Sequence, residues 1–297
     1  MFKTLLLTGK QRLEWVEAPA PALLQGYARL RTLKTAVSVS STLSEYLGNV
    51  DVDFPRASGY ESLARIEETT DPEHFPVGLR VVDVYGHSDQ AIRPFSRLIP
   101  VPEHIPDEVA LLSILACDAF KGVYRLRPLK NSRVLVVGAG VMGLLSIWNL
   151  IQLGHEVDVF DPISERLNLA EQLGARSLHR VPYETHRFAL ECSGHPDAFF
   201  SMQRAMVQGG KIGVLSDGNW GRLQLAPEFH SRELTVVGSS DGVRYQDHAR
   251  IFFRMPLEQQ MPLVKIFDCH IKAAGLIALF ESMAEGPRPL KVMVDWT

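Results

Sequence analysis

The stretch that most constrains the fold begins at Arg133 and reads "RVLVVGAGVMGLLSIWNLIQLGHEVDVFD". A short apolar run, a glycine-rich turn, a segment with helical spacing and a second apolar run follow one another in it. Both apolar runs are nearly continuous, which is typical of parallel strands buried on both faces of a sheet. The stretch therefore predicts a strand, a crossover helix and a second, parallel strand.

The same alternation continues to about residue 240. Further apolar runs occur in "RFALECSG", "KIGVLS" and "ELTVVGSS", with helix-like segments between them. Strands joined by crossover helices indicate a doubly wound domain, in which helices cover both faces of a parallel sheet. The expected fold class is α/β, with a domain of the Rossmann type as its clearest part.

The first 110 residues differ, because they consist of short strand-like runs separated by turn residues. Prolines in "RPFSRLIPVPEHIPDE" mark a connector, and "DEVALLSILACDAFKGVYRL" after it predicts a helix. The tail ends in a helix and a last strand, "LKVMVDW", whose neighbours periodicity does not fix. A chain of 297 residues is expected to form two domains. We place a β-rich domain at 1–118 with 268–297 and the doubly wound domain at 119–267.

Composition excludes several classes of function. The net charge is -3 with both signs interspersed, which gives no basic face for nucleic acid and no polybasic anchor for a membrane. No stretch approaches the roughly 20 apolar residues of a membrane span, and the start does not read as a signal peptide. Three dispersed cysteines form neither a disulfide framework nor a structural zinc motif. We therefore expect a cytoplasmic protein whose partner is a small molecule.

The glycine-rich turn has the spacing and context of a dinucleotide site. Its first glycine permits a tight turn, its second lets backbone approach a pyrophosphate, and its third lets helix and strand pack closely. The phosphate would lie at the helix N-terminus. A plain strand-to-helix turn is the alternative interpretation. The candidate cofactor residues here are Gly138, Gly140, Val141, Met142 and Gly143.

An acidic residue, Asp161, ends the second strand of the pattern. A carboxylate at this place accepts hydrogen bonds from both hydroxyl groups of an adenosine ribose and repels a 2′-phosphate. We therefore favour NAD(H) over NADP(H) as the cofactor. Nearby Arg166 is a candidate cofactor residue as a partner for a phosphate, or else a surface residue of the following helix.

The order of these parts resembles the medium-chain dehydrogenase/reductase superfamily, the relatives of alcohol dehydrogenase. The resemblance covers essentially the whole chain and implies a GroES-like β domain, an inserted Rossmann domain and a C-terminal return to the first domain. "RLNLAEQLGA", "VQGGKIGVLS" and "SRELTVVGSS" are similar to stretches of that family. "ECSG" resembles its motif along the cofactor, which adds Cys192, Ser193 and Gly194 to the candidate cofactor residues.

Zinc enzymes of this family bind the metal through a Gly-His-Glu motif, an earlier cysteine and a cysteine before the Rossmann domain. Here the first motif reads Gly59, Tyr60, Glu61, and Ser38 stands in place of the earlier cysteine. Only Cys117 remains. One soft ligand does not build the nitrogen and sulfur site that catalytic zinc requires, so we expect no zinc.

The resemblance implies a proton path without metal. Tyr60 replaces the zinc-binding histidine, so its phenol would exchange the proton of the substrate oxygen, and Ser40, at the place of the family's relay hydroxyl, would pass it outward. Glu61 would tune the site or form a structural ion pair. Tyr60 as a packing residue is an equal alternative.

"GYESLARIEE" and "PLKVMVDW" resemble a branch, bacteriochlorophyllide a dehydrogenase, that oxidises a hydroxyethyl group on a chlorin ring, although "VSVSS" departs from it. The function expected is zinc-independent interconversion of a secondary alcohol and a ketone of a biosynthetic intermediate. Reduction of an activated C=C or C=N bond is one alternative, and an inactive dinucleotide-binding sensor is another. The family also implies a homodimer joined along the edges of the Rossmann sheets.

Overall fold

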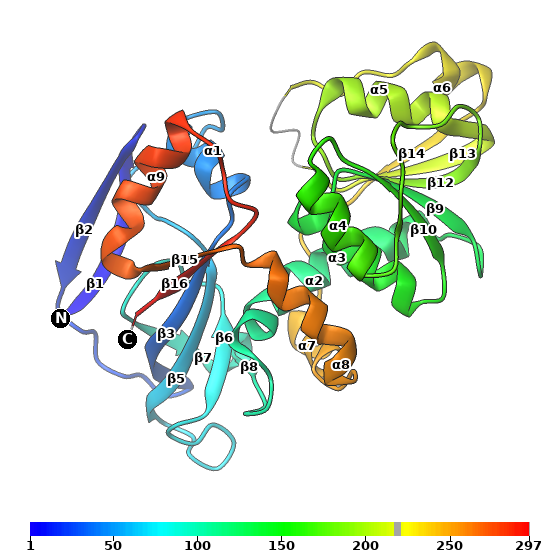
Figure 1. Ribbon diagram of the computed structural model, residues 1–297. Helices are drawn as coiled ribbons and strands as arrows, with labels where there is room; N and C mark the ends of the chain where they lie inside the picture. Colours follow the sequence, from blue (N-terminus) through cyan, green and yellow to red (C-terminus); the bar gives the residue numbers. More distant parts are fainter. Residues whose placement is uncertain (217–220, 297) are drawn as a thin grey trace. The chain divides into compact units, whose positions relative to one another are not determined.

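The computed structural model describes residues 1–216 and 221–296, and it divides into two compact units (Figure 1). Unit 1 consists of Met1–Ser113 and Tyr245–Thr297, and unit 2 of Ile114–Arg244. Residues 245–267, which we expected in the second domain, thus pack with the first unit. Within the described ranges no helix has the length and apolar character needed to cross a bilayer.

Unit 2 is built on a sheet of six parallel strands in the order β11-β10-β9-β12-β13-β14. Numbered by position in the chain this order is 3-2-1-4-5-6, the arrangement of a Rossmann fold. The predicted α/β class and doubly wound domain are therefore confirmed. The strands are β9 (Arg133–Val137), β10 (Glu156–Phe160), β11 (Arg176–Ser177), β12 (His186–Glu191), β13 (Met206–Val214) and β14 (Thr235–Gly238).

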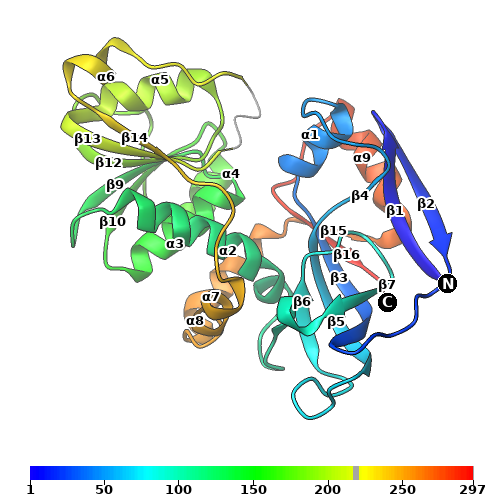
Figure 2. The same ribbon diagram turned by 180° about the vertical axis from the view of Figure 1, so that it is seen from behind.

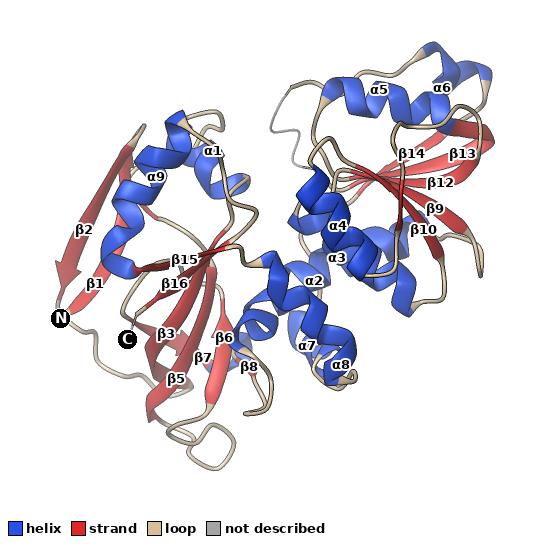
Figure 3. Ribbon diagram, viewed as in Figure 1, coloured by secondary structure: helices blue, strands red, loops and turns tan. Residues whose placement is uncertain are grey.

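Helices cover both faces of this sheet (Figure 3). Figures 1 and 2 place α5 and α6 over one face and α3 and α4 over the other. Both faces of β9 are buried from Val134 onward, which is why its sequence is apolar without alternation. The helices of this unit are α3 (Val141–Gln152), α4 (Ser164–Gln172), α5 (Pro196–Ala205) and α6 (Pro227–Ser231), and α2 (Asp107–Leu126) enters it from unit 1.

Unit 1 is built on two sheets, one of seven strands and one of three. The larger has the order β15-β16-β3-β5-β6-β8, with β7 also paired to β3, and the smaller has the order β2-β1-β4. The strands are β1 (Phe2–Gly9), β2 (Arg12–Ala18), β3 (Tyr27–Val37), β4 (Arg56–Ala57), β5 (Glu61–Thr69), β6 (Arg80–Asp83), β7 (Gln90–Pro94), β8 (Ile99–Pro100), β15 (Cys269–Lys272) and β16 (Val292–Asp295).

The last strand of the chain, β16, lies between β15 and β3 and pairs antiparallel with β3. This settles the place of "LKVMVDW", which the sequence left open. Residues from both ends of the chain also share one core, in which α9 packs on α1 and β1 and the rings of Tyr46 and Phe280 lie 5.4 Å apart. The helices of unit 1 are α1 (Ser41–Leu47), α7 (Tyr245–Phe252), α8 (Leu257–Gln260) and α9 (Leu276–Glu285), with short 3-10 turns at Phe95–Arg97, Met261–Ile266 and Ala273–Gly275.

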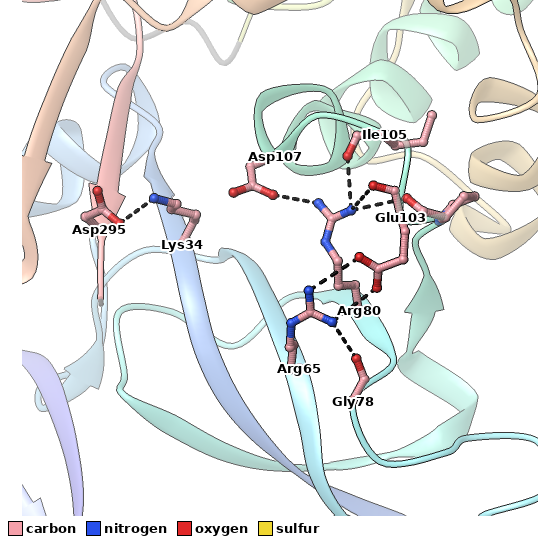
Figure 4. Close-up of polar contacts among 9 residues, drawn as sticks. Lys34, Arg65, Gly78, Arg80, Glu103, Ile105, Asp107 and Asp295 are labelled. Atoms are coloured by element: carbon pink, nitrogen blue, oxygen red, sulfur yellow. Dashed lines mark hydrogen bonds and ion pairs between the residues drawn. The ribbon is translucent and has the colours of Figure 1, made fainter.

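A buried arginine fixes the proline-rich connector to this unit. The guanidinium of Arg80 on β6 donates to the carbonyl oxygens of Pro102, Glu103 and Ile105, and it pairs with the carboxylate of Asp107 at 2.6 Å (Figure 4). One buried side chain thus donates to four acceptors, and these bonds hold the segment that leads into α2.

Candidate cofactor and proton-transfer sites

The glycine turn joins β9 to α3 at the carboxyl end of the sheet. Gly138 has a φ of +96°, and a Cβ on it would lie 2.6 Å from the amide nitrogen of Ser193. A Cβ on Gly143 would lie 1.9 Å from the carbonyl oxygen of Gly138. The backbone therefore excludes any side chain at both positions.

Gly140 has a different reason to be glycine, because a Cβ there would meet nothing within 4 Å. Open space beside this residue lies at the N-terminus of α3, whose first turn contains no acidic side chain. Val141 and Met142, the first residues of that helix, are partly exposed. A helix N-terminus attracts anions, so the residues present fit the pyrophosphate of a dinucleotide.

Asp161 lies beside this turn, directly after β10. One of its carboxylate oxygens accepts a hydrogen bond of 2.7 Å from the amide of Ala139, and the other accepts one of 2.9 Å from the amide of Ile163. The carboxylate thus holds the glycine turn in place, a role that the sequence did not suggest. Each oxygen keeps capacity for a further hydrogen bond, which is what a ribose would need.

Arg166 belongs to the first turns of α4, close in sequence to Asp161, and is half-buried. Its position in the chain leaves both earlier interpretations open, a partner of the cofactor or a residue of the helix surface.

Glu191, at the end of β12, is a functional candidate that sequence reasoning missed. It is fully buried, and its Oε1 accepts hydrogen bonds from the amide of Ser193 at 2.8 Å, from the hydroxyl of Ser193 at 2.5 Å and from the amide of Gly194 at 2.9 Å. These bonds shape the loop that touches Gly138. The signal that could have revealed it is a carboxylate at the end of an otherwise apolar strand.

Cys192 lies in the same loop, next to Ser193 and partly exposed. Burial of its thiol group, followed by the negative charge of Glu191, raises the pKa of Cys192. The side chain is therefore a neutral thiol that helps to form the loop. The structure thus brings Gly138, Asp161 and Ser193 together, and their role in binding a cofactor stays a prediction.

The Gly-Tyr-Glu motif forms a turn at the start of β5 in unit 1. Glu61 is completely buried, and its Oε1 lies 2.7 Å from the ammonium of Lys291, which is buried as well. Lys291 immediately precedes β16 and has the ring of Phe267 5.8 Å away. Of the two roles expected for Glu61, the ion pair is the one visible in this geometry.

Tyr60 is half-buried, and Ser40 is exposed at the N-cap position of α1. The carbonyl of Ser40 accepts a hydrogen bond from the amide of Ser44, and the hydroxyl of Ser41 donates to that of Ser38. These contacts belong to the start of the helix. They leave the proposed relay between Tyr60 and Ser40 as a prediction.

Ser38, Tyr60 and Cys117 are the residues that the family resemblance assigns to the three zinc-ligand positions. The Cys117 thiol is buried and donates to the carbonyl oxygen of Val243 at 3.5 Å, and burial raises its pKa to about 11. Two hydroxyl groups and one neutral thiol do not fit the donor set of catalytic zinc. Among residues 1–216 and 221–296, no cluster of three histidine, cysteine or carboxylate side chains could hold a metal ion.

Taken together, the Rossmann strand order, the glycine turn and the acid after the second strand define a dinucleotide-binding protein of the dehydrogenase type. The chain is 31% identical to an L-threonine 3-dehydrogenase of Xanthomonas campestris pv. campestris (strain B100) over 246 residues, which are 76% of this chain and 68% of the relative. Residues 122–202 match the family described as alanine dehydrogenase/PNT, C-terminal domain.

Solved structures share the fold along the whole chain. The short chain alcohol dehydrogenase (rspB) of E. coli CFT073, complexed with NADH, has a TM-score of 0.82 at 18% identity and covers 99% of both chains. S. aureus TarJ in complex with NADPH has a TM-score of 0.86 at 16% identity, over 100% of this chain and 99% of that one. The chain belongs to the medium-chain dehydrogenase/reductase superfamily, as its motifs indicated, and is an NAD(P)-dependent oxidoreductase of the alcohol dehydrogenase-like type.

Proposed function

We propose that this protein interconverts a secondary alcohol and a ketone of a biosynthetic intermediate, without zinc and with NAD(H) in preference to NADP(H). The observation that carries the proposal is the set of side chains at the three positions that the family resemblance assigns to metal ligands, Ser38, Tyr60 and Cys117, in a chain that also has a glycine turn fitting a dinucleotide. A bound nicotinamide supplies or accepts the hydride. The protein has to bind both reactants and move one proton.

Tyr60 is the proposed proton-transfer group. Its phenol donates a proton to the substrate oxygen during reduction and accepts it during oxidation. The usual pKa of tyrosine is about 10, so the site must stabilise the phenolate for oxidation near neutral pH. Ser40 passes the proton outward. Lys291 neutralises Glu61, which keeps an uncompensated negative charge away from the turn that carries Tyr60.

Preference for NAD(H) follows from Asp161. The amides of Ala139 and Ile163 fix its carboxylate next to the glycine turn. A 2′-phosphate would therefore be repelled by a negative charge whose position is fixed. Solved neighbours include one complex with NADH and one with NADPH, so the fold alone does not decide the preference. The loop of Cys192, Ser193 and Gly194 borders this site.

The most direct experiment combines metal analysis of the purified protein with titration of NADH and of NADPH. We expect no stoichiometric zinc and tighter binding of NADH. In Asp161→Ser, the Kd values for NADH and NADPH should lie closer together than in the parent protein. One zinc ion per chain, lost together with activity in Cys117→Ser, would overturn the proposal, and a chain that binds neither nucleotide would do the same.

Candidate substrates form the second part of the test. L-threonine belongs in the panel because the relative in Xanthomonas campestris is an L-threonine 3-dehydrogenase. A hydroxyethyl chlorin belongs in it because of the resemblance of "GYESLARIEE" and "PLKVMVDW" to that branch. Oxidation of such an alcohol to a ketone supports the proposal, whereas binding of NADH without any turnover supports a sensor.

The alternative enzyme function is reduction of an activated C=C or C=N bond. It is favoured by the same side chains at the three ligand positions, because a conjugated substrate supplies its own electron sink and needs no Lewis acid. The product decides between the two reactions. A saturated bond with an intact carbonyl indicates the alternative, and a new alcohol indicates the main proposal.

The expected homodimer is also a proposal. In the described ranges β14 pairs only with β13, so its outer edge has backbone groups available for a second copy. Sedimentation at several protein concentrations tests this.

A further inference from the structure

The turn that carries Tyr60 is held by a neighbouring loop, at the centre of which lies His87. The amide of His87 donates to the carbonyl oxygen of Ser58 at 2.8 Å, and the amide of Leu5 donates to the carbonyl oxygen of His87 at 2.9 Å. Gly86 packs closely as well, since a Cβ on it would lie 2.8 Å from the carbonyl oxygen of Ser58. Backbone contacts thus lock the loop and the turn together.

The imidazole of His87 adds a side-chain contact to this arrangement. Gly59 has a φ of +78°, and a Cβ on it would lie 2.5 Å from Nε2 of His87 and 2.7 Å from Cδ2. The edge of the ring therefore lies directly against the Cα of Gly59. The residue that follows Gly59 is Tyr60, so the ring supports the backbone just before the proposed proton-transfer group.

The other side of the ring is anchored to the C-terminal end of the chain. Nδ1 of His87 lies 2.8 Å from the hydroxyl oxygen of Thr35, and the same oxygen accepts a hydrogen bond of 3.0 Å from the indole nitrogen of Trp296. His87 is completely buried, and burial lowers its pKa to about 3. The ring is therefore neutral at physiological pH, and its orientation is fixed by Thr35.

A residue that only filled space here would not need ring nitrogens. Nε2 of His87 is buried and has no hydrogen-bond partner among the described residues, which an apolar ring of similar shape would avoid. Two geometric demands favour histidine. It bonds to Thr35 through Nδ1, and it presents a narrow edge to Gly59.

We propose that His87 is a positioning residue, whose anchored ring sets the backbone of Gly59 and thereby the direction in which Tyr60 leaves the turn. The proposal rests on the proposed role of Tyr60 in proton transfer. The proposal predicts that substitution of His87 lowers kcat and leaves the affinity for the cofactor unchanged. The reason is that the residues of the glycine turn belong to unit 2 and His87 to unit 1.

The first experiment compares His87→Asn with His87→Phe in the full-length protein. Asparagine can keep the bond to Thr35, whereas phenylalanine cannot. We expect kcat per NADH-binding site to fall on the order of tenfold or more in His87→Phe, because small displacements of a catalytic group are costly. The kcat of His87→Asn should remain close to that of the parent protein. The Kd for NADH should stay unchanged in both.

Normalising kcat to titrated NADH sites separates positioning from mere stability, since an unstable variant loses sites and keeps its turnover per site. His186→Asn is the matched control, because His186 is also buried and hydrogen-bonded, to Asp158 at 2.9 Å, but lies in the other unit. It should reduce stability without lowering kcat per site. Equal turnover per site in His87→Phe and the parent would overturn the proposal.

A second measurement tests the contact itself. Gly59→Ala places a methyl group against the ring, and His87→Ala removes the ring. If the ring sets the turn, the loss in kcat of the double variant should be smaller than the product of the two single losses. Independent, multiplicative losses contradict the proposal.

Tyr60→Phe separates the positioning role of His87 from the proton-transfer role of Tyr60. If it lowers kcat while His87→Phe does not, only the positioning role is wrong. If Tyr60→Phe leaves kcat unchanged, the proposed proton path itself fails, whatever the His87 variants do.

Discussion

The three glycines between β9 and α3 are needed for different physical reasons, and this difference can be tested. Gly143→Ala places a Cβ 1.9 Å from a backbone oxygen, whereas Gly140→Ala points into open space. We expect Gly143→Ala to lower the free energy of unfolding by about 1–3 kcal/mol or more. Gly140→Ala should leave it nearly unchanged.

For NADH binding, we expect Gly140→Ala to be the more affected of the two variants. The methyl group of Gly140→Ala occupies the space expected for the pyrophosphate, so its Kd for NADH should rise on the order of tenfold or more, about 1.4 kcal/mol. Thermal unfolding and NADH titration of both variants provide the check. Normal NADH affinity in Gly140→Ala would mean that the cofactor does not lie along this turn.

Glu61 and Lys291 form a buried ion pair, and removing one partner leaves an uncompensated charge. We expect Lys291→Met to lower the free energy of unfolding by about 3–5 kcal/mol. The double variant Glu61→Leu with Lys291→Met should recover much of this loss, because no charge then remains buried. Chemical denaturation of the three proteins measures the difference, and equal stability of the single and double variants would argue against a buried charge.

At the scale of elements, the strands β9, β10 and β12 could be predicted from the sequence because they are largely buried on both faces and therefore read as apolar runs. The helix predicted after the prolines was equally clear, and α2 spans Asp107–Leu126. Local pattern does not contain the pairing of distant segments. The position of β16 between β15 and β3, and the packing of residues 245–267 in unit 1, depend on contacts far apart in the chain.

Substitution of Arg80 tests how strongly its hydrogen bonds stabilise the connector before α2. Arg80→Met removes the donor to three carbonyl groups and leaves Asp107 without this partner, so we expect a loss of about 2–3 kcal/mol in unfolding free energy. Arg65→Met is the control, since Arg65 donates to a single carbonyl oxygen, that of Gly78, and its pair with Glu103 is largely exposed, so we expect a smaller loss of about 1 kcal/mol. Urea denaturation compares them, and similar losses would contradict the argument.

At the scale of the whole molecule, buried neutral histidines should make the protein sensitive to acid. Burial lowers the pKa of His87 to about 3 and that of His248 to about 4. At a pH below about 6.5, the usual pKa of histidine, these histidines bind protons in the unfolded chain but not in the folded protein. The free energy of unfolding therefore decreases as the pH decreases. Each ring contributes a slope of about 1.4 kcal/mol per pH unit until the folded pKa is reached.

Urea denaturation between pH 7.5 and pH 4.5 measures this slope. His87→Asn should reduce it by the contribution of one proton, while a surface variant such as His104→Asn should keep it, because His104 is exposed. An unchanged slope in His87→Asn would show that this ring is not held neutral in the folded protein.

The sequence by itself determined the fold class, the glycine turn and the acid after the second strand, because these depend on residues within about thirty positions of one another. The family resemblance likewise predicts from Ser38 and Tyr60 that metal ligands are replaced, and this stays a prediction. The tertiary structure alone decided that Glu61 pairs with Lys291, that Glu191 shapes the loop against Gly138, and that His87 lies beneath Gly59. Such contacts join segments far apart in the chain, and only folding brings them within reach of a hydrogen bond.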